Sequence, residues 1–92
     1  SNCKSLTTAS FPKASIIYSR AFYNCTNLLS LYLMGSSVAT LSNINAFTST
    51  PISNYTTSTG GVHGSIYVPA SLYNSYKTAT RWSTYSARFV SV

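Results

Sequence analysis

A segment near the start of the chain occurs twice: NCKSLTTASFP at 2–12 is followed by YNCTNLLSLYL at 23–33. The matched pairs share one constant offset, and they are Cys3 and Cys25, Leu6 and Leu28, Ala9 and Leu31, and Phe11 and Leu33. The second copy has the spacing L-x-x-L-x-L, which is typical of the strand segment of leucine-rich repeats of about 20–29 residues. Such units stack, because one unit cannot bury its apolar face alone. This repeat constrains the fold more than any other feature of the sequence.

A second part of the unit recurs as well. Residues 19–25 (SRAFYNC) and 44–50 (INAFTST) both centre on an Ala-Phe pair. Phe22 and Phe47 lie slightly further apart in the chain than the matched pairs do. The second unit is therefore slightly longer than the first, and we place the extra residues in 34–43.

Alternating apolar residues predict four short parallel strands, near 6–11, 28–33, 65–68 and 89–92. In the second strand Leu31 and Leu33 point to one side and Tyr32 to the other, because successive side chains alternate across a strand. In the third strand Ile66 and Val68 alternate around Tyr67 in the same way. In the last strand Val90 and Val92 follow the same alternation.

The best helix of the sequence is expected at 69–80. Proline is tolerated in the first turn of a helix, and Leu72, Tyr76 and Ala79 fall on one helical face. Trp82 follows the helix, and we expect it to be buried over that face.

These elements predict an α/β fold: a short leucine-rich-repeat solenoid of stacked parallel strands, with irregular connections and a C-terminal capping helix. We expect a single domain over 1–92. It would comprise two repeats near 3–47, a long loop at 48–64 and a terminal strand-helix-strand cap at 65–92.

The Ala-Phe pair at 21–22, with the cysteine and leucine spacing that follow it, resembles the repeat of BspA-like leucine-rich-repeat proteins. The end of the chain resembles the end of such an array, with a Tyr67-Val68-Pro69 strand, a short helix and Trp82. Members of this family are surface and secreted proteins, chiefly of host-associated bacteria and some protists. The resemblance implies an extracellular or cell-surface location and contact with a protein or glycan ligand.

The chain has six Lys and Arg residues and no Asp or Glu, which gives a formal net charge of +6. Without carboxylates it lacks paired acid/base groups, a Ser-His-Asp triad and a site for hard metal ions. We therefore expect no enzymatic activity, no cofactor and no metal site. The basic residues are scattered, so we expect no specific nucleic-acid binding, although the net charge leaves polyanion binding as an alternative. No apolar run approaches the roughly 18 residues of a membrane-spanning helix, so we expect no membrane insertion.

The sequence contains one histidine and two cysteines. The single histidine, His63, lies in the stretch GGVHG and is expected to be a loop residue rather than a catalytic or zinc-binding one. Cys3 and Cys25 fall at equivalent positions of adjacent units, about one strand spacing apart. Stacked core thiols are the commoner arrangement at such positions, and a disulfide is also feasible in geometry.

The candidate binding residues are those that alternate with the core positions of the second and third strands: Ser30, Tyr32, Ser65 and Tyr67. Thr8 and Ser10 extend the same face on the first strand. We predict that the two tyrosine rings lie side by side as a small aromatic platform, suited to a sugar ring or an apolar protein side chain. The alternative is that these rings only shield the sheet, because tyrosine favours strands for its own reasons.

Two functional hypotheses follow. The leading one is a non-enzymatic binding or adhesion module at the C-terminal end of a surface repeat protein. The second is a purely structural cap or spacer without a ligand of its own. Because the chain enters where a preceding Ala-Phe pair should stand, we expect upstream repeats of the same parent chain as a further partner.

Overall fold

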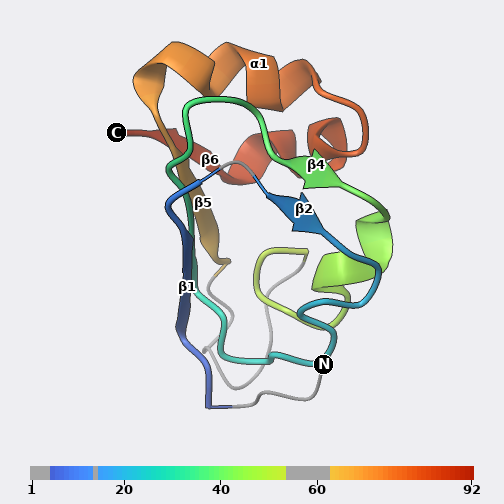
Figure 1. The fold of residues 1–92 in the computed structure, drawn as a ribbon. Helices are drawn as coiled ribbons and strands as arrows, with labels where there is room; N and C mark the ends of the chain where they lie inside the picture. The colour runs from blue at the N-terminus through green and yellow to red at the C-terminus, as the bar shows by residue number, and fades with distance from the viewer. Residues whose placement is uncertain (1–4, 14, 54–62) are drawn as a thin grey trace.

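The larger of two parallel sheets forms one side of the molecule (Figure 1). The computed structural model describes residues 5–13, 15–53 and 63–92. The strands of this sheet, in spatial order, are β1 (Thr8–Phe11), β3 (Ser30–Leu33), β5 (Ser65–Val68) and β6 (Phe89–Ser91). All neighbouring strands in it are parallel. The predicted α/β class and the four predicted strands are confirmed, with β1 and β3 starting slightly later than expected.

The repeat seen in the sequence is also the register of this sheet. β1 pairs with β3 so that Ala9 lies opposite Leu31 and Phe11 lies opposite Leu33, the pairs that the sequence matches. Leu31 and Leu33 are 0% and 1% exposed. The inward residues of β5 are equally buried. The predicted phase of the second and third strands is therefore confirmed.

The predicted phase of the last strand is wrong. Phe89 is the residue that faces the core, whereas Val90 and Val92 are 39% and 58% exposed. The ring of Phe89 packs against the rings of Tyr76 and Trp82, with centroids 5.5 and 6.0 Å apart. An aromatic ring buries more apolar area than a valine side chain, so these tertiary contacts decide the phase of the strand.

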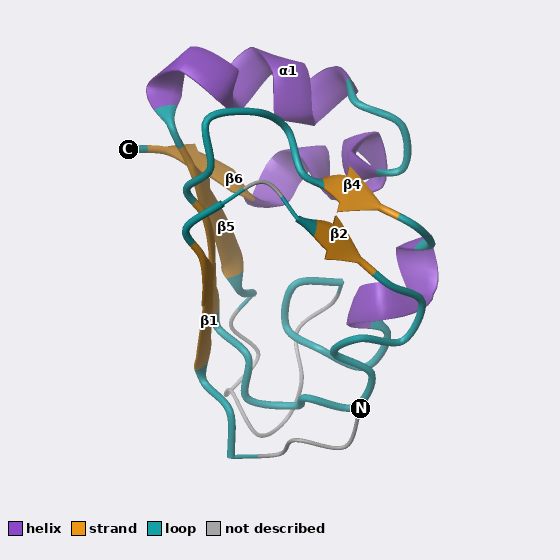
Figure 2. Ribbon diagram, in the orientation of Figure 1, coloured by secondary structure: helices purple, strands orange, loops and turns teal. Residues whose placement is uncertain are grey.

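A smaller sheet lies across the core from the larger one (Figure 2). It consists of β2 (Ile16–Ile17) and β4 (Thr40–Leu41), which are also parallel. Ile17 and Leu41 point into the core and are almost fully buried. The sequence did not predict this sheet, because strands as short as these show no alternation.

The two Ala-Phe pairs, at 21–22 and 46–47, pack on each other. The second pair ends η1, a 3-10 helix at Ile44–Phe47. The rings of Phe22 and Phe47 are stacked, with centroids 5.7 Å apart and an interplanar angle of 3°. The backbone N–H of Phe22 donates to the carbonyl oxygen of Ala46 at 2.8 Å. The second half of the repeat is thus also packed unit on unit.

Helical segments near the C-terminus cover the end of the core that lies beside β4 (Figure 1). They are η3 (Ala70–Leu72), α1 (Tyr73–Thr78) and η4 (Trp82–Arg88). The α-helix is shorter than the predicted 69–80, because Ala79 takes an extended conformation and ends it. Tyr76 and Trp82 are each 1% exposed, and Leu72 and Ala79 pack against the core. The predicted burial of Trp82 and of one helical face is confirmed.

Side chains of these segments take the place of a further strand at the outer edge of β4. The backbone N–H of Ala39 donates to the hydroxyl oxygen of Tyr76 at 2.8 Å. The indole Nε1–H of Trp82 donates to the carbonyl oxygen of Ala39 at 2.7 Å, and Arg81 Nη1 donates to that of Leu41 at 3.3 Å. Peptide groups at a sheet edge need partners. Here, side chains supply them.

The ends of the predicted 48–64 loop pack into the molecule. Thr50 and Ile52 are fully buried, and the hydroxyl of Thr50 donates to the carbonyl oxygen of Phe47 at 2.7 Å. Residues 54–62, the central part of that predicted loop, lie outside the described residues.

The structure corrects the favoured prediction for Cys25. This residue is fully buried and disulfide-bonded, rather than carrying a core thiol. Cys3, the other cysteine of the sequence, lies outside the described residues. A disulfide restricts the unfolded chain, so it suits a domain with a small core.

Candidate functional site

The four candidate residues lie together on the outer face of the larger sheet. Ser30 pairs with Ser65 and Tyr32 pairs with Tyr67 in the register of β3 and β5. All four side chains are partly exposed, and they alternate with buried ones along both strands. No helix of the described part of the chain covers this side of the sheet (Figures 1 and 2). The sequence therefore predicted correctly which residues share this face.

The two tyrosine rings lie side by side and face each other. Their centroids are 4.7 Å apart and their planes differ by 15°, which is a stacked arrangement. The two rings are therefore stacked from strand to strand, and both are partly exposed. The two rings are neighbours at about one strand spacing, as predicted, and the structure adds that they stack face to face. Each ring has an inner face against its neighbour and an outer face that points along the sheet.

The outer ring faces have different neighbours. Ser10 of β1 lies opposite Tyr32, and Val90 of β6 lies opposite Tyr67. Ser10 is exposed and carries only a hydroxymethyl group, whereas Val90 is branched and 39% exposed. The predicted contribution of Ser10 to this face is confirmed by the register. Val90 was missed, because the strand phase was misassigned; treating Phe89 as the core residue would have found it.

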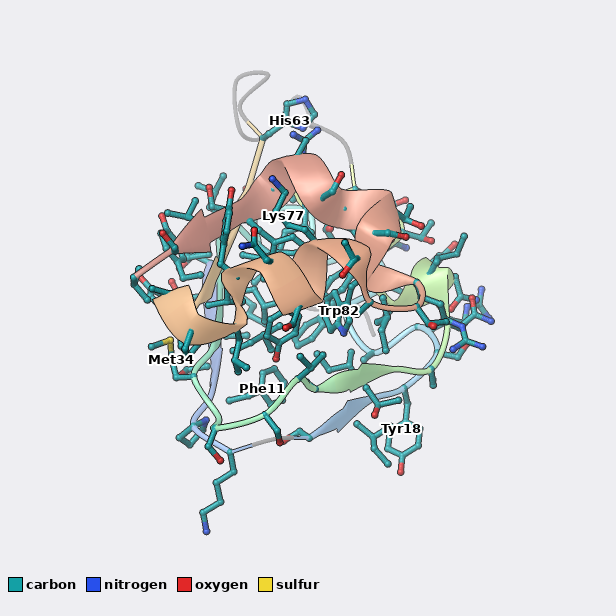
Figure 3. The ribbon with its side chains drawn as sticks, turned by 90° about the horizontal axis from the view of Figure 1, so that it is seen from above. Phe11, Tyr18, Met34, His63, Lys77 and Trp82 are labelled. Carbon is teal, nitrogen blue, oxygen red and sulfur yellow. The ribbon has the colours of Figure 1, made fainter. Side chains whose placement is uncertain are left out.

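Apolar residues extend the face beyond the tyrosines. Met34 directly follows β3 and, by alternation, continues the side of the strand that carries Tyr32. It is 40% exposed and points away from the molecule in Figure 3. Val92 continues the side that carries Val90 and is 58% exposed. We call the set Ser10, Tyr32, Tyr67 and Val90, with the hydroxyl-bearing Thr8, Ser30 and Ser65, the tyrosine face.

The core residues beneath hold the tyrosine face in place. Leu31, Leu33, Ile66 and Val68 are at most 1% exposed, so β3 and β5 have little freedom to shift. Gly64 allows the entry into β5: a Cβ there would lie only 3.0 Å from the carbonyl oxygen of Leu28. The position of Ser65 thus follows a close backbone approach that a larger residue at position 64 would crowd.

Cations in the described segments contact tyrosine rings elsewhere. The guanidinium carbon of Arg20 lies 4.6 Å from the ring centroid of Tyr23, and Lys77 Nζ lies 4.9 Å from that of Tyr73. Such contacts attract a cation to the negative face of a ring. In a chain without Asp or Glu they are a local alternative to ion pairs. Neither contact involves the tyrosine face.

A small cavity of about 190 Å³ lies beside the outer edge of β4. Its lining residues come from two segments, Val38–Leu41 and Ala79–Trp82. Arg81 borders it and has a positive φ of 66°. Its guanidinium is engaged with the carbonyl oxygen of Leu41, so this residue has a structural partner.

His63 lies outside the helices and strands, as predicted, and is exposed. Its Nε2 is 3.3 Å from Arg88 Nη2 (Figure 3 labels His63). Among residues 5–13, 15–53 and 63–92, no group of three His, Cys, Asp or Glu side chains is placed to hold a metal ion. Within the same residues, no helix is long and apolar enough to cross a membrane.

The tyrosine face is thus a preformed, uncharged surface in which hydroxyl groups border a stacked pair of rings. It offers aromatic rings and hydrogen-bonding hydroxyl groups. Comparison with known protein families, with curated proteins and with solved structures found no match to this chain.

Proposed function

We propose that this chain is a non-enzymatic binding module that contacts a protein or glycan through the tyrosine face. The observation that carries the proposal is the stacked, partly exposed pair of Tyr32 and Tyr67 on a side of the sheet that no described helix covers. Tyrosine combines a large apolar area with a hydrogen-bonding hydroxyl and little conformational freedom, so it is frequent at binding hot spots. The strands that carry the face are supported from below by the core, which lowers the entropic cost of binding.

The same proposal includes the setting of the module. Strand pairs that follow the sequence repeat, and stacked Ala-Phe pairs, support a leucine-rich-repeat solenoid of the BspA-like type. We propose that the chain forms the C-terminal end of such an array, located at the cell surface or secreted. Upstream repeats of the same parent chain would pair with β1 and β2.

A binding screen with matched variants tests this proposal. We expect the chain to bind at least one component of a glycan array or of a panel of purified extracellular proteins. The Tyr32→Ala, Tyr67→Ala double variant should lose at least about tenfold in affinity, as expected when hot-spot residues are truncated. The control is Tyr18→Ala, because Tyr18 is 65% exposed and lies on the segment after β2. Equal affinity of the double variant and the wild type would place the ligand elsewhere.

The alternative is a structural cap without a ligand. The observation that favours it is the closed outer edge of β4, where Tyr76 and Trp82 complete the hydrogen bonds of Ala39. A cap without a ligand predicts no binding to the glycan array or to the protein panel. It also predicts that fusing a matching repeat before β1 raises the melting temperature.

The salt dependence of binding tests the polyanion alternative. An affinity that stays unchanged between about 50 and 200 mM salt would favour the tyrosine face over simple attraction to a polyanion, which weakens steeply over that range.

A further inference from the structure

The two outer ring faces of the tyrosine pair have different residues beside them in the strand register. The outer face of Tyr67 points away from Tyr32, toward the β6 side of the sheet, where the register partner is the branched Val90. The outer face of Tyr32 points away from Tyr67, toward the β1 side of the sheet, where the register partner Ser10 is small and exposed. The face of Tyr32 above Ser10 is therefore the open end of the ring stack.

The spacing of this open end suits one more ring. The rings of Tyr32 and Tyr67 are 4.7 Å apart, which matches the roughly 4.8 Å between neighbouring strands. A ring placed above Ser10 would continue the stack at one further strand spacing. Stacked rings are favourable at centroid distances of about 4.5–7 Å. We call this position, bounded by Ser10 and the outer face of Tyr32, the Ser10 slot.

The surroundings of the Ser10 slot indicate what kind of ring it would accept. Thr8 and Ser30 are register partners two residues before Ser10 and Tyr32. They therefore lie on the same side of the sheet. Their hydroxyl groups both donate and accept hydrogen bonds. No charged residue belongs to the face, so a neutral ligand meets no unpaired charge there.

We propose that the Ser10 slot binds a neutral pyranose ring of a glycan, stacked on the outer face of Tyr32. A pyranose with equatorial hydroxyl groups has an apolar face of axial C–H bonds, and these meet the negative face of the tyrosine ring. Its peripheral hydroxyl groups find partners in Thr8, Ser10 and Ser30. An aromatic side chain of a protein carries at most one polar group and would leave most of these hydroxyl groups without a partner. This inference rests on the proposed function and names the ligand class for the same face.

The test is a titration of the ¹⁵N-labelled chain with three neutral oligosaccharides: cellotetraose, chitotriose and lactose. We expect at least one of them to shift the amide signals of Ser10, Tyr32 and their neighbours. The ring current of Tyr32 should also move the axial sugar protons upfield. Phenol serves as a probe for an aromatic side chain.

Variants make the position specific. Tyr32→Leu removes the stacking face and should weaken binding at least tenfold, whereas Tyr67→Leu removes only its support and should weaken it less. Ser10→Tyr fills the slot with the chain's own ring and should abolish binding. Tyr18→Leu, away from the face, should bind as the wild type does. Far-ultraviolet circular dichroism and Trp82 fluorescence check that each variant is folded.

Several results would overturn the inference. It is wrong if none of the three sugars binds above background, or if Ser10→Tyr binds as tightly as the wild type. Shifts from phenol without shifts from any sugar would assign the slot to an aromatic side chain of a protein. In that last case a protein ligand sensitive to Tyr32→Leu would leave the proposed binding function intact, while the glycan inference fails.

Discussion

The two ends of the strand stack are built from equivalent units but differ in how they are closed. At the β1–β2 end, Ala9 and Phe11 are only partly buried, although their repeat partners Leu31 and Leu33 are at most 1% exposed. Ile16 is 51% exposed. Equivalent sequence positions thus reach full burial only when a further unit packs on them.

The opposite end is closed by side chains of the terminal segments. Tyr76 and Trp82 satisfy the peptide groups of Ala39, and their rings meet at a centroid distance of 5.6 Å. Phe47 contacts the ring of Trp82 at 6.0 Å and that of Tyr85 at 5.4 Å. A cluster of rings therefore covers the last Ala-Phe unit. A repeat stack can thus be ended by a few aromatic side chains with polar tips.

Removing the central side chain of the closed end should have the largest effect. Trp82→Ala should lower the free energy of unfolding by about 3–5 kcal/mol, the usual cost of deleting a buried tryptophan. It also leaves the carbonyl oxygen of Ala39 without its donor. Urea denaturation measures the change, with Tyr18→Ala as the exposed control. A melting temperature within a degree or two of the wild type would show that this end is not closed by Trp82.

Removing one hydroxyl group should have a smaller effect at the same place. Tyr76→Phe keeps the ring but leaves the buried N–H of Ala39 without an acceptor, which costs about 1–3 kcal/mol. The matched control is Tyr73→Phe, because the hydroxyl of Tyr73 accepts a long hydrogen bond of 3.4 Å from Lys77 Nζ. Equal urea midpoints for the two variants would contradict the view that side chains close the outer edge of β4.

Alkaline pH should weaken the closed end. Burial raises the pKa of Tyr76 and of Tyr85 above the ordinary 10.0, although the hydrogen bond from Ala39 partly opposes the shift of the Tyr76 pKa. Above about pH 10 the unfolded chain loses these protons while the folded chain keeps them, so the free energy of unfolding falls. Well below that pH both states are protonated, and these groups cause no change.

The measurement is urea denaturation at about pH 8, 10 and 11, because this range brackets the ordinary tyrosine pKa. The loss of stability should be smaller in Tyr85→Phe, which has one buried phenol fewer. A free energy of unfolding that is equal at the lowest and highest of these pH values would contradict the expectation.

A change at the open end should have the smallest effect. Ile16→Thr should alter the free energy of unfolding by no more than about 0.5 kcal/mol, because exposed positions away from special features tolerate substitution. The neighbouring Ile17→Thr is the contrast, since Ile17 is 2% exposed and this variant places a hydroxyl group in the core. Similar losses in both variants would mean that Ile16 is covered in solution, for example by a second copy of the chain.

Much of the tyrosine face was predictable because parallel strands and side-chain alternation are local rules. The sequence repeat placed Tyr32 beside the strand that carries Ser10, and alternation placed Tyr67 on the same side. Whether the rings would stack face to face or lie flat depends on side-chain rotamers. Those are chosen by neighbouring side chains, so the sequence pattern could not predict the open face above Ser10.

By itself, the sequence determined the repeat, its register and the parallel order of the strands, because similar periodic units bury their apolar faces only by stacking in phase. The sequence also shows that the chain has no Asp or Glu side chains. Tertiary structure alone decided the phase of β6, the short strands β2 and β4, and the hydrogen bonds that join Tyr76 and Trp82 to Ala39. These features join residues that are far apart in the chain, and they arise from packing of large rings, which no local period in the sequence encodes.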